Sequence, residues 1–384
     1  MAPQCFETMP RIRFGAGSVE TLGEEVRRLE GSRVLIVTDP GIVKAGVLEA
    51  VKTVLDKAGL AVTAFTEVES DPSLEAARAC VQAAAFARPE VVVGVGGGSS
   101  LDLAKVAAVM IANEGPIEAY FGMELVPRPG VPLILIPTTA GTGSEMTSIS
   151  VLSDTQNQVK KGIVSRHLFA RAAILDPLLT LELPQRVTAI TGMDALVHAI
   201  ESYVGVRATV FTDTLNLQAI RLVAGNLRPA FANGRNLAAR ENMLYASCLA
   251  GMAFSNTQNG LDHALALAIG GKYHLPHGLL TAFLLPWVME FNAIAVPHKF
   301  ARIAEAFGEP VAGLPALEAA RRAVAAVRAL LADLGISTRL GDYGVSRQDI
   351  PAIARAALGA TRLIGNNPRT VTEADVVGML ERNY

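Results

Sequence analysis

Three histidines and one aspartate in this sequence have the spacing of metal ligands: Asp194, His198, His263 and His277. The chain has only six histidines in 384 residues, so three of them in one such set is a marked concentration. Asp194 and His198 are one helical turn apart in a stretch with helical apolar periodicity, which predicts that their side chains share one face. A divalent cation held by such ligands can polarise a carbonyl group or stabilise an alkoxide.

The other two candidate ligands come from separate segments. His263 lies in a very apolar stretch, residues 261–269, that predicts a second helix. His277 lies between Pro276 and Gly278, which predicts a loop that leads into the next helix. Side chains from two helices and a loop can converge on one ion. Three imidazoles and one carboxylate suit Fe²⁺ and Zn²⁺ alike, and intrinsic affinity favours Zn²⁺.

A non-catalytic alternative is that the histidines are core residues of a dinucleotide-binding or structural protein. A lone histidine on an apolar helix is usually of this kind. Each buried polar group needs a partner, however, so a set of four is difficult to accommodate as core residues alone. The spacing therefore favours a metal site.

Composition predicts a soluble cytoplasmic protein large enough for two domains. Hydrophobic residues make up 51% of the chain, which is ample for large cores. The net charge of −2 gives no electrostatic basis for binding nucleic acid or an anionic membrane. No apolar run reaches the ~18 residues of a spanning helix, and the N-terminus lacks the features of a secretory signal. Cys5, Cys80 and Cys248 are too few and too widely spaced for a disulfide framework.

The first half of the chain alternates strand-like and helix-like segments. Continuous apolar runs predict strands at residues 33–38, 61–65, 91–95 and 132–136. Helical periodicity lies between them, at residues 47–58, 73–87 and 101–112. Such alternation predicts a parallel sheet that is covered by helices on both faces.

From about residue 183 onward the pattern changes to helices. Segments with helical periodicity are residues 187–204, 213–231, 237–254, 316–334 and 347–358. We therefore predict an NAD-binding α/β domain over residues 1–180 and an all-helical, metal-binding domain over residues 181–384. The four candidate metal ligands all lie in the second domain.

A glycine-rich turn, Gly96–Lys105, leads from a predicted strand into a predicted helix. Its glycines let backbone N–H groups approach a ligand, and the helix N-terminus adds partial positive charge, which together suit a pyrophosphate. Ser99 and Asp102 also have the spacing of a capping box, so Asp102 is either a helix cap or a ligand contact. Lys105 is expected to be a solvated helix residue.

Two further segments follow strand ends. Pro137–Glu145 is dense in hydroxyl groups and is either an ordinary turn or a second wall of a nucleotide cleft. Asp39 begins an Asp-Pro-Gly turn, and its carboxylate can also accept a hydrogen bond from a ribose 2′-hydroxyl. Because this carboxylate would repel a 2′-phosphate, it favours NAD over NADP. All three strand ends lie on the edge of the sheet where ligands bind in open α/β folds.

Together these segments resemble the iron-containing (group III) alcohol dehydrogenases over essentially the whole chain. The matching segments are residues 14–17, 38–41, 96–105, 137–145, 176–177, 192–195 with 198–201, 276–278 and 366–369. The metal segment and the segment at residues 137–145 are the specific ones, whereas the glycine turn is shared more widely.

The resemblance implies a dehydroquinate synthase-like architecture, with a dinucleotide-binding α/β domain and a helical domain. It implies that Fe²⁺ is bound by Asp194, His198, His263 and His277. It implies that NAD lies near Asp39, Gly97, Gly98, Ser99, Thr138, Thr139, Thr142 and Lys160. Asp102 is added to this set from its place in the glycine turn. The substrate pocket is expected at Ile149, Val151, Phe254 and Leu267.

One position departs from the family's pattern. Many members carry a second histidine four residues after the third ligand, where it is thought to help move the proton, and this chain has Leu267 there. The usual proton route is therefore in doubt. A chain of hydroxyl groups and water, a shifted pH optimum and a substrate other than a simple primary alcohol all remain open.

The resemblance implies an NAD-dependent enzyme that interconverts small alcohols or diols with aldehydes or ketones by hydride transfer, as a dimer or larger homo-oligomer. Alternatives of the same fold are an enzyme acting on a hydroxy acid or polyol, a glycerol-dehydrogenase-like zinc enzyme and a dehydroquinate synthase-type lyase. The fourth ligand, His198, argues against the three-ligand zinc pattern. A lyase of that type needs lysine and arginine around the metal, whereas the flanking segments 195–197, 264–269 and 279–280 are apolar. A small, weakly polar substrate is therefore favoured.

Overall fold

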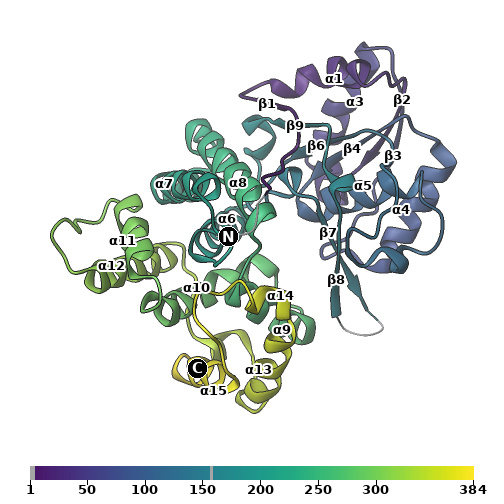
Figure 1. Cartoon of the computed structure of the whole chain (residues 1–384). Coiled ribbons are helices and arrows are strands. Elements are labelled where there is room, and N and C mark those ends of the chain that lie inside the picture. The colour runs from purple at the N-terminus through teal and green to yellow at the C-terminus, as the bar shows by residue number, and fades with distance from the viewer. Residues whose placement is uncertain (1–4, 156–158) are drawn as a thin grey trace. The chain divides into compact units, whose positions relative to one another are not determined.

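The computed structural model describes residues 5–155 and 159–384, which form two compact units. One unit is Glu7–Leu183, and the other is Pro184–Tyr384 together with Cys5 and Phe6. The first contains a parallel sheet with helices, and the second is helical (Figure 1). The predicted fold class is confirmed.

Six parallel strands form the main sheet of the α/β unit, in the order β1-β9-β6-β4-β2-β3. Their bounds are β1 Ile12–Phe14, β2 Arg33–Val37, β3 Ala61–Phe65, β4 Val91–Gly96, β6 Leu133–Pro137 and β9 Ala172–Leu175. The four strands predicted from apolar runs are confirmed to within one residue at each end. β1 and β9 are not predicted from the sequence. They have only 3 and 4 residues, which is too few to show a periodic pattern of apolar side chains.

Helices cover both faces of this sheet, as the continuous apolar strands predict. The helices are α1 Leu22–Arg28, α2 Pro40–Lys44, α3 Val47–Lys57, α4 Leu74–Ala87 and α5 Gly98–Met110. One face packs with α1 and α3 in a core that includes Val34, Ile36, Leu22 and Val51. On the other face α5 lies so close to β4 that a Cβ atom at Gly94 would come within 2.8 Å of the Ala104 Cβ.

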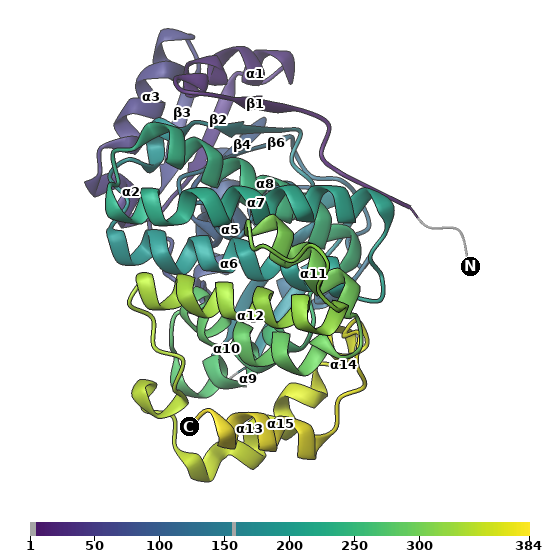
Figure 2. The same ribbon diagram turned by 90° about the vertical axis from the view of Figure 1, so that its left-hand side faces the viewer.

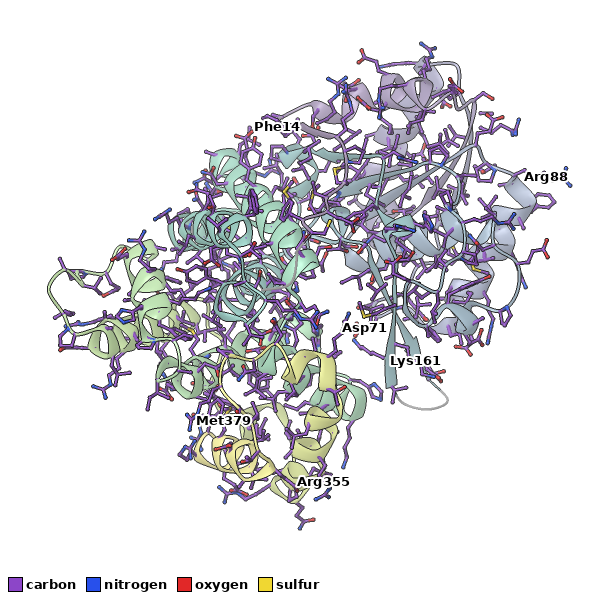
Figure 3. All side chains as sticks on the ribbon, viewed as in Figure 1. Phe14, Asp71, Arg88, Lys161, Arg355 and Met379 are labelled. Atoms are coloured by element: carbon purple, nitrogen blue, oxygen red, sulfur yellow. The ribbon has the colours of Figure 1, made fainter. Side chains whose placement is uncertain are left out.

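A second, three-stranded sheet in the α/β unit is absent from the prediction. It consists of β5 Gly122–Met123, β7 Ile149–Asp154 and β8 Val159–Val164, with β7 and β8 antiparallel. β8 contains adjacent lysines, Lys160 and Lys161, and the second of these is labelled in Figure 3. Two charged residues and a glycine in so short a segment hide the apolar alternation that would otherwise indicate a strand.

The second unit contains helices and no strand among its described residues (Figure 2). Their bounds are α6 Gln185–Val204, α7 Val210–Ala232, α8 Leu237–Thr257, α9 Leu261–Tyr273, α10 His277–Ala293, α11 Pro297–Ala306, α12 Ala316–Asp333, α13 Ile350–Gly359, α14 Thr361–Ile364 and α15 Glu373–Arg382. α6 is the central helix, since every residue from Gly192 to Val204 is buried. It packs against α7, α8 and α10. Each helix predicted for this half exists.

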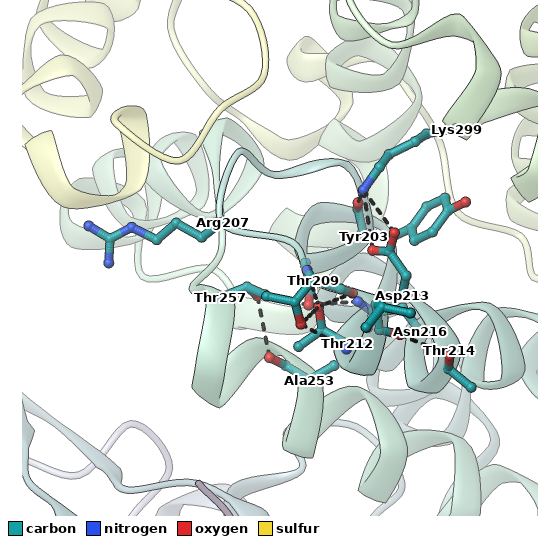
Figure 4. Close-up of polar contacts among 12 residues, drawn as sticks. Tyr203, Arg207, Thr209, Thr212, Asp213, Thr214, Asn216, Ala253, Thr257 and Lys299 are labelled. Atoms are coloured by element: carbon teal, nitrogen blue, oxygen red, sulfur yellow. Dashed lines mark hydrogen bonds and ion pairs between the residues drawn. The ribbon is translucent and has the colours of Figure 1, made fainter. Parts of the chain in front are cut away.

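A polar cluster fixes the end of α6 (Figure 4). The Lys299 ammonium group donates a hydrogen bond to the Tyr203 carbonyl oxygen and lies 3.2 Å from Asp213 Oδ1. The hydroxyl oxygen of Ser202 accepts hydrogen bonds from Asn216 Nδ2 at 2.7 Å and from Thr257 Oγ1 at 2.8 Å. These contacts join α6 to α7, α8 and α11, so the helix that carries two candidate ligands is held at its C-terminal end.

Several helix ends differ from the prediction for identifiable reasons. α7 begins three residues early because Thr209 and Thr212 cap each other reciprocally. α5 begins at Gly98 with Gly97 at its N-cap, so the capping box proposed for Ser99 and Asp102 is wrong. α10 begins at His277 itself, which therefore lies at a helix N-terminus and not in a loop. Among the described residues, no helix is both long and apolar enough to span a membrane.

Candidate active site

The helical unit brings candidate metal ligands together from three helices. One ligand atom each from Asp194 on α6, His263 on α9 and His277 on α10 lie within 4.8 Å of one another. His198 lies beside this group: its Nδ1 is 3.9 Å from Asp194 Oδ2, and its ring stacks on that of His263 with centroids 4.8 Å apart. The four residues named from sequence spacing are thus neighbours in space.

His263 is oriented by a carboxylate that the sequence interpretation missed. Its Nδ1 lies 2.7 Å from Glu201 Oε2, and both side chains are buried. Its Nε2 is buried and has no hydrogen-bond partner in the described parts of the chain. A carboxylate at Nδ1 favours the tautomer with the proton on Nδ1, which leaves the Nε2 lone pair available to a cation. The sequence signal for Glu201 is its place three residues after His198 on the same helix.

Asp194 is held by α10. The Thr281 hydroxyl donates a hydrogen bond to Asp194 Oδ1 at 3.0 Å, and His277 Nε2 lies 3.8 Å from the same oxygen. Burial would raise the pKa of Asp194, but electrostatic interactions with the three histidines and the Thr281 hydrogen bond outweigh it and lower the pKa. An ionised, buried carboxylate next to three imidazoles is a donor set that fits Fe²⁺ or Zn²⁺.

A glycine allows α10 to begin so close to α6. A Cβ atom at Gly278 would lie 2.6 Å from the carbonyl oxygen of Ile190, so a larger residue would push the two helices apart. Pro276 at the N-cap and Gly278 after His277 therefore serve the approach of His277 to Asp194. The Pro-His-Gly signal in the sequence has this packing explanation.

A second buried acid lies next to His263. Asp262 has both carboxylate oxygens buried without a partner among the described residues, and its backbone N–H donates to Glu201 Oε1 at 2.6 Å. Burial raises the pKa of Asp262 well above its ordinary value, and the negative charges of Glu201 and Asp194 raise it further. Asp262 therefore holds a proton more tightly than an ordinary aspartate does.

Two apolar residues expected in the substrate pocket belong to this unit. Phe254, on α8, stacks on His198 with ring centroids 4.2 Å apart. Leu267 lies on α9, one turn after His263, and is partly buried. The structure thus places Phe254 next to a candidate ligand.

In the α/β unit, three strand ends meet at one edge of the sheet. Ser100 Oγ donates a hydrogen bond to Asp39 Oδ2 at 3.0 Å, which links the ends of β2 and β4. A Cβ atom at Gly98 would lie 2.7 Å from Thr142 Cγ2, and one at Gly97 would lie 3.5 Å from Thr139 Cγ2. β2 and β4 are neighbours although β3 intervenes in the sequence, so this edge is the reversal point of strand order where such folds bind ligands.

Asp39 has the turn role that its sequence suggests. Its Oδ1 accepts hydrogen bonds from the backbone N–H groups of Gly41 and Ile42 and so caps α2, with Pro40 in the first turn. Asp39 is a partly buried residue. Thr138, by contrast with Asp39, is buried. Its backbone N–H donates a hydrogen bond to the Gly96 carbonyl oxygen at 2.9 Å.

Asp102 and Lys105 make hydrogen bonds that the sequence does not indicate. Asp102 Oδ1 accepts a hydrogen bond from Ser144 Oγ at 2.6 Å, and its Oδ2 accepts one from the Val151 N–H at 2.8 Å. Lys105 is fully buried, so its expected solvation is wrong; its Nζ donates to Ser144 Oγ, Thr147 Oγ1 and the Ile149 carbonyl oxygen. Both side chains bind the hydroxyl-rich loop and β7 to α5.

A buried glutamate accompanies this lysine. Burial raises the pKa of Glu145 to about 7, although a backbone hydrogen bond and the charge of Lys105 act in the opposite direction. Burial also lowers the pKa of Lys105. The sequence places Glu145 and Lys105 in two separate motifs and gives no sign that they lie together.

Lys160 and Ser99 share a neighbour that the sequence interpretation missed. Lys160 Nζ lies 2.6 Å from Asp71 Oδ1, and the Asp71 N–H donates to Ser99 Oγ at 3.3 Å. Asp71 has a φ of 53°, which is uncommon for a residue other than glycine. Its left-handed conformation in the segment Ser70-Asp71-Pro72 places it between the glycine turn and β8.

Two family models match this chain. The model described as iron-containing alcohol dehydrogenase matches residues 10–177, and that described as Fe-containing alcohol dehydrogenase family, C-terminal, matches residues 188–384. The chain belongs to the iron-containing alcohol dehydrogenase family. The expected family is confirmed, and so is the class of enzyme, an oxidoreductase acting on CH–OH groups.

Individual relatives resemble the chain over nearly its whole length. Sulfoacetaldehyde reductase of Bilophila wadsworthia is 47% identical over 379 residues, which covers 98% of both chains. The solved structure of a 1,3-propanediol oxidoreductase superposes with a TM-score of 0.97 at 40% identity and covers 100% of both chains. A sulfoacetaldehyde reductase from Bifidobacterium kashiwanohense, solved in complex with NAD⁺, has a TM-score of 0.90 at 28% identity and covers 100% of this chain and 99% of that one.

These findings agree with the function that the sequence implies. The chain is an NAD-dependent, metal-dependent alcohol dehydrogenase that interconverts alcohols with carbonyl compounds by hydride transfer. The non-catalytic alternative and the lyase alternative both lose their support.

Proposed function

We propose that Asp194, His198, His263 and His277 hold the Fe²⁺ ion of this enzyme. The observation that carries this proposal is the buried Nε2 of His263, which has no partner in the described residues and lies with ligand atoms of Asp194 and His277 within 4.8 Å. Zn²⁺ fits the same donor set on intrinsic affinity, and the family's description favours iron.

NAD is the proposed partner of the strand ends in the α/β unit. The proposed contacts are Asp39, Gly97, Gly98, Ser99, Asp102, Thr138, Thr139, Thr142 and Lys160. Support comes from the close approach of Gly98 to Thr142, which leaves no room for a side chain, and from the carboxylate of Asp39 at the end of β2. A carboxylate there favours a ribose hydroxyl over a phosphate.

The protein's own groups have separate tasks in the proposed reaction. When bound, Fe²⁺ supplies a positive charge that favours the alkoxide form of the alcohol, and NAD⁺ supplies the hydride acceptor. Glu201 keeps the proton on Nδ1 of His263, and Thr281 fixes the orientation of Asp194. Phe254 covers one face of His198 and excludes water from it.

The proton leaves by a route without the family's usual histidine. Leu267 has no group that takes up a proton, so we propose that hydroxyl groups and water carry it. Phe254 and Leu267 are the proposed apolar substrate contacts of the helical unit, and Ile149 and Val151 are those of the α/β unit. These side chains suit a short alcohol or diol, and the compounds named for two of the relatives, sulfoacetaldehyde and 1,3-propanediol, have two and three carbons.

A cytoplasmic location and a homodimer or larger assembly complete the proposal. The three cysteines form no disulfide in the described residues, and Cys80 and Cys248 are buried, which accords with a reducing compartment. No nucleic-acid or membrane partner is proposed.

Formation of NADH by metal-stripped enzyme, with and without Fe²⁺ added under anaerobic conditions, tests this function. We expect turnover of short alcohols and 1,3-propanediol with NAD⁺ that depends on added Fe²⁺. Turnover that persists without metal, or stoichiometric metal uptake with no oxidation of any alcohol, diol or hydroxy acid, would contradict it.

A further inference from the structure

Two arginines of the helical unit lie near each other without a counter-charge among the described residues. Arg207 follows α6, and Arg362 lies on α14. Both are exposed, and neither guanidinium group has an ion-pair or hydrogen-bond partner within residues 5–155 and 159–384. Figure 4 shows the Arg207 side chain extending away from the polar cluster at the end of α6. Although the Arg362 side chain is exposed, partial desolvation of its guanidinium group by the surrounding protein lowers its pKa, and the positive charge of Arg207 lowers it further.

Asn366 fixes the position of this pair. Its Oδ1 accepts a hydrogen bond from the Arg207 N–H at 3.1 Å, and its backbone oxygen accepts one from the Val206 N–H at 3.0 Å. Its Nδ2 donates to the carbonyl oxygens of Gln258 at 2.9 Å and Asn259 at 3.2 Å. Asn366 is fully buried and lies one turn of chain after Arg362. One side chain thus joins the segments that carry both arginines to the loop between α8 and α9.

The joined segments lead directly to the candidate metal site. α6 carries His198, and its last residue, Val204, is six residues further on, which is about 9 Å of helix rise. The loop at Gln258 and Asn259 joins α8, which carries Phe254, to α9, which carries His263. A Cβ atom at Gly260, the next residue of this loop, would lie 3.7 Å from Asn367 Oδ1 and 3.0 Å from Oε1 of Glu201, the carboxylate paired with His263. The segment that carries Arg362 is therefore held next to the residues that orient a candidate ligand.

The same loop contains unsatisfied polar groups. Gln258 has a φ of 79°, and Gln258 and Asn259 each have a buried side-chain oxygen without a partner among the described residues. Buried amides of this kind mark a place for a polar ligand, and an amide turned by 180° offers N–H donors in place of oxygen.

We propose that Arg207 and Arg362 bind an oxyanion at the far end of the substrate, a sulfonate or a carboxylate. Guanidinium groups present several N–H donors in a plane and suit anions with two or three oxygens. The carbonyl end of the substrate then lies among apolar side chains, and the charged end lies at the arginines. The reaction remains alcohol plus NAD⁺ to aldehyde, NADH and a proton. This inference rests on the proposed function and adds the substrate class.

Three alcohols of similar size test the proposal: 2-hydroxyethanesulfonate, 3-hydroxypropanoate and 1-propanol. The ratio of kcat/KM for a charged alcohol to that for 1-propanol is measured in the iron-loaded wild type and in Arg207→Gln and Arg362→Gln. We expect each substitution to lower the ratio about 10- to 100-fold, mainly through KM, because a charged hydrogen bond is lost. The sulfonate and carboxylate ratios show which anion the pair prefers.

Arg355→Gln is the matched control. Arg355 is exposed on α13, pairs with Glu373 and projects from the helical unit (Figure 3). The same loss of charge there should leave the ratio unchanged. An unaltered ratio in both test variants, or a wild-type ratio below one for both anions, would overturn the proposal.

Binding of ethanesulfonate, measured by calorimetry, separates this inference from the proposed function. Ethanesulfonate has the charged end but no hydroxyl group, so its binding does not require turnover. Binding that weakens in Arg362→Gln and not in Arg355→Gln supports the arginine site even if no alcohol is oxidised. Equal binding to all variants, with turnover of 1-propanol intact, overturns the arginine site and leaves the proposed function standing.

Discussion

Glu201 Oε2 lies 2.7 Å from His263 Nδ1 in the interior of the helical unit, and the opposite nitrogen of that ring has no partner among the described residues. The carboxylate therefore selects which nitrogen of His263 can bind a cation. Gly260 makes room for it, since a Cβ atom there would lie 3.0 Å from Glu201 Oε1.

Glu201→Gln tests this relationship. The substitution removes the negative charge but keeps the size of the side chain, so we expect iron affinity to fall about 10- to 100-fold, as is usual for partners of metal-bound histidines. Glu290→Gln, an exposed position on α10 paired with Arg328, is the control. Iron affinity is measured by competition with a chelator, and equal affinity in both variants would show that Glu201 does not support the site.

Asp39→Ser tests the cofactor preference. Serine is also a good N-cap residue, so α2 should remain capped while the negative charge is lost. We expect the ratio of kcat/KM for NADP⁺ to that for NAD⁺ to rise about 10- to 100-fold, because repulsion of a 2′-phosphate disappears. An unchanged ratio in a variant with wild-type thermal stability would remove Asp39 from the nucleotide site.

Lys105→Met tests the buried polar network beneath the hydroxyl-rich loop. The substitution removes the donor to Ser144 Oγ and Thr147 Oγ1 and the shorter of two hydrogen bonds to the Ile149 carbonyl oxygen. It also leaves Glu145 without its nearby cation. Breaking a buried charged contact costs about 3–5 kcal/mol, which corresponds to a fall of about 6–20 °C in the thermal midpoint of a unit of this size. Lys161→Met, at a half-exposed ion pair with Asp154, should lower the midpoint by no more than about 3 °C. Similar midpoints for the two variants would contradict the buried role.

Glu25→Gln tests the pH dependence of stability in the α/β unit. Burial would raise the pKa of Glu25, but hydrogen bonds from Arg28, Arg13 and Arg11 outweigh it and lower the pKa to about 2. A lowered folded-state pKa stabilises the fold above the unfolded-state value of 4.5, and this stabilisation is lost as the pH falls from there to about 2.

At pH 7 we expect Glu25→Gln to destabilise the unit by about 1–2 kcal/mol, a value reduced because the three arginines are partly exposed. The difference in thermal midpoint between wild type and variant should shrink below pH 4 and vanish near pH 2. A difference that is constant from pH 7 to pH 3 would show that the charge of Glu25 contributes nothing.

The sequence predicts this fold well where the apolar residues of a segment follow a single pattern, either a continuous run or helical spacing. Strands such as β2 and β4 are continuous apolar runs, and α6 and α12 carry clear helical periodicity, so each is identified close to its observed bounds. β8 is not identified from the sequence. Two of its side chains are charged lysines, and the strand belongs to a small separate sheet. Helix starts at Gly98 and Val210 depend on capping geometry that apolar periodicity does not contain.

The same limit applies to the candidate site. The four candidate metal ligands are recognisable because histidine is rare in this chain and because their spacing is typical of metal ligands. Glu201 and Thr281 are common residue types whose role arises only when α6, α9 and α10 pack together. The burial of Lys105 could not be predicted either, since its partners come from a loop and a strand about 40 residues away.

The central claim is that His263 is a ligand of the catalytic iron. Iron content per chain and turnover of 1,3-propanediol with NAD⁺ should be measured together, in the wild type and in His263→Ala, after reconstitution with Fe²⁺ under anaerobic conditions. We predict about one iron per chain and turnover in the wild type, and less than about one-tenth of each in the variant. Full iron content and full turnover in His263→Ala would contradict the account.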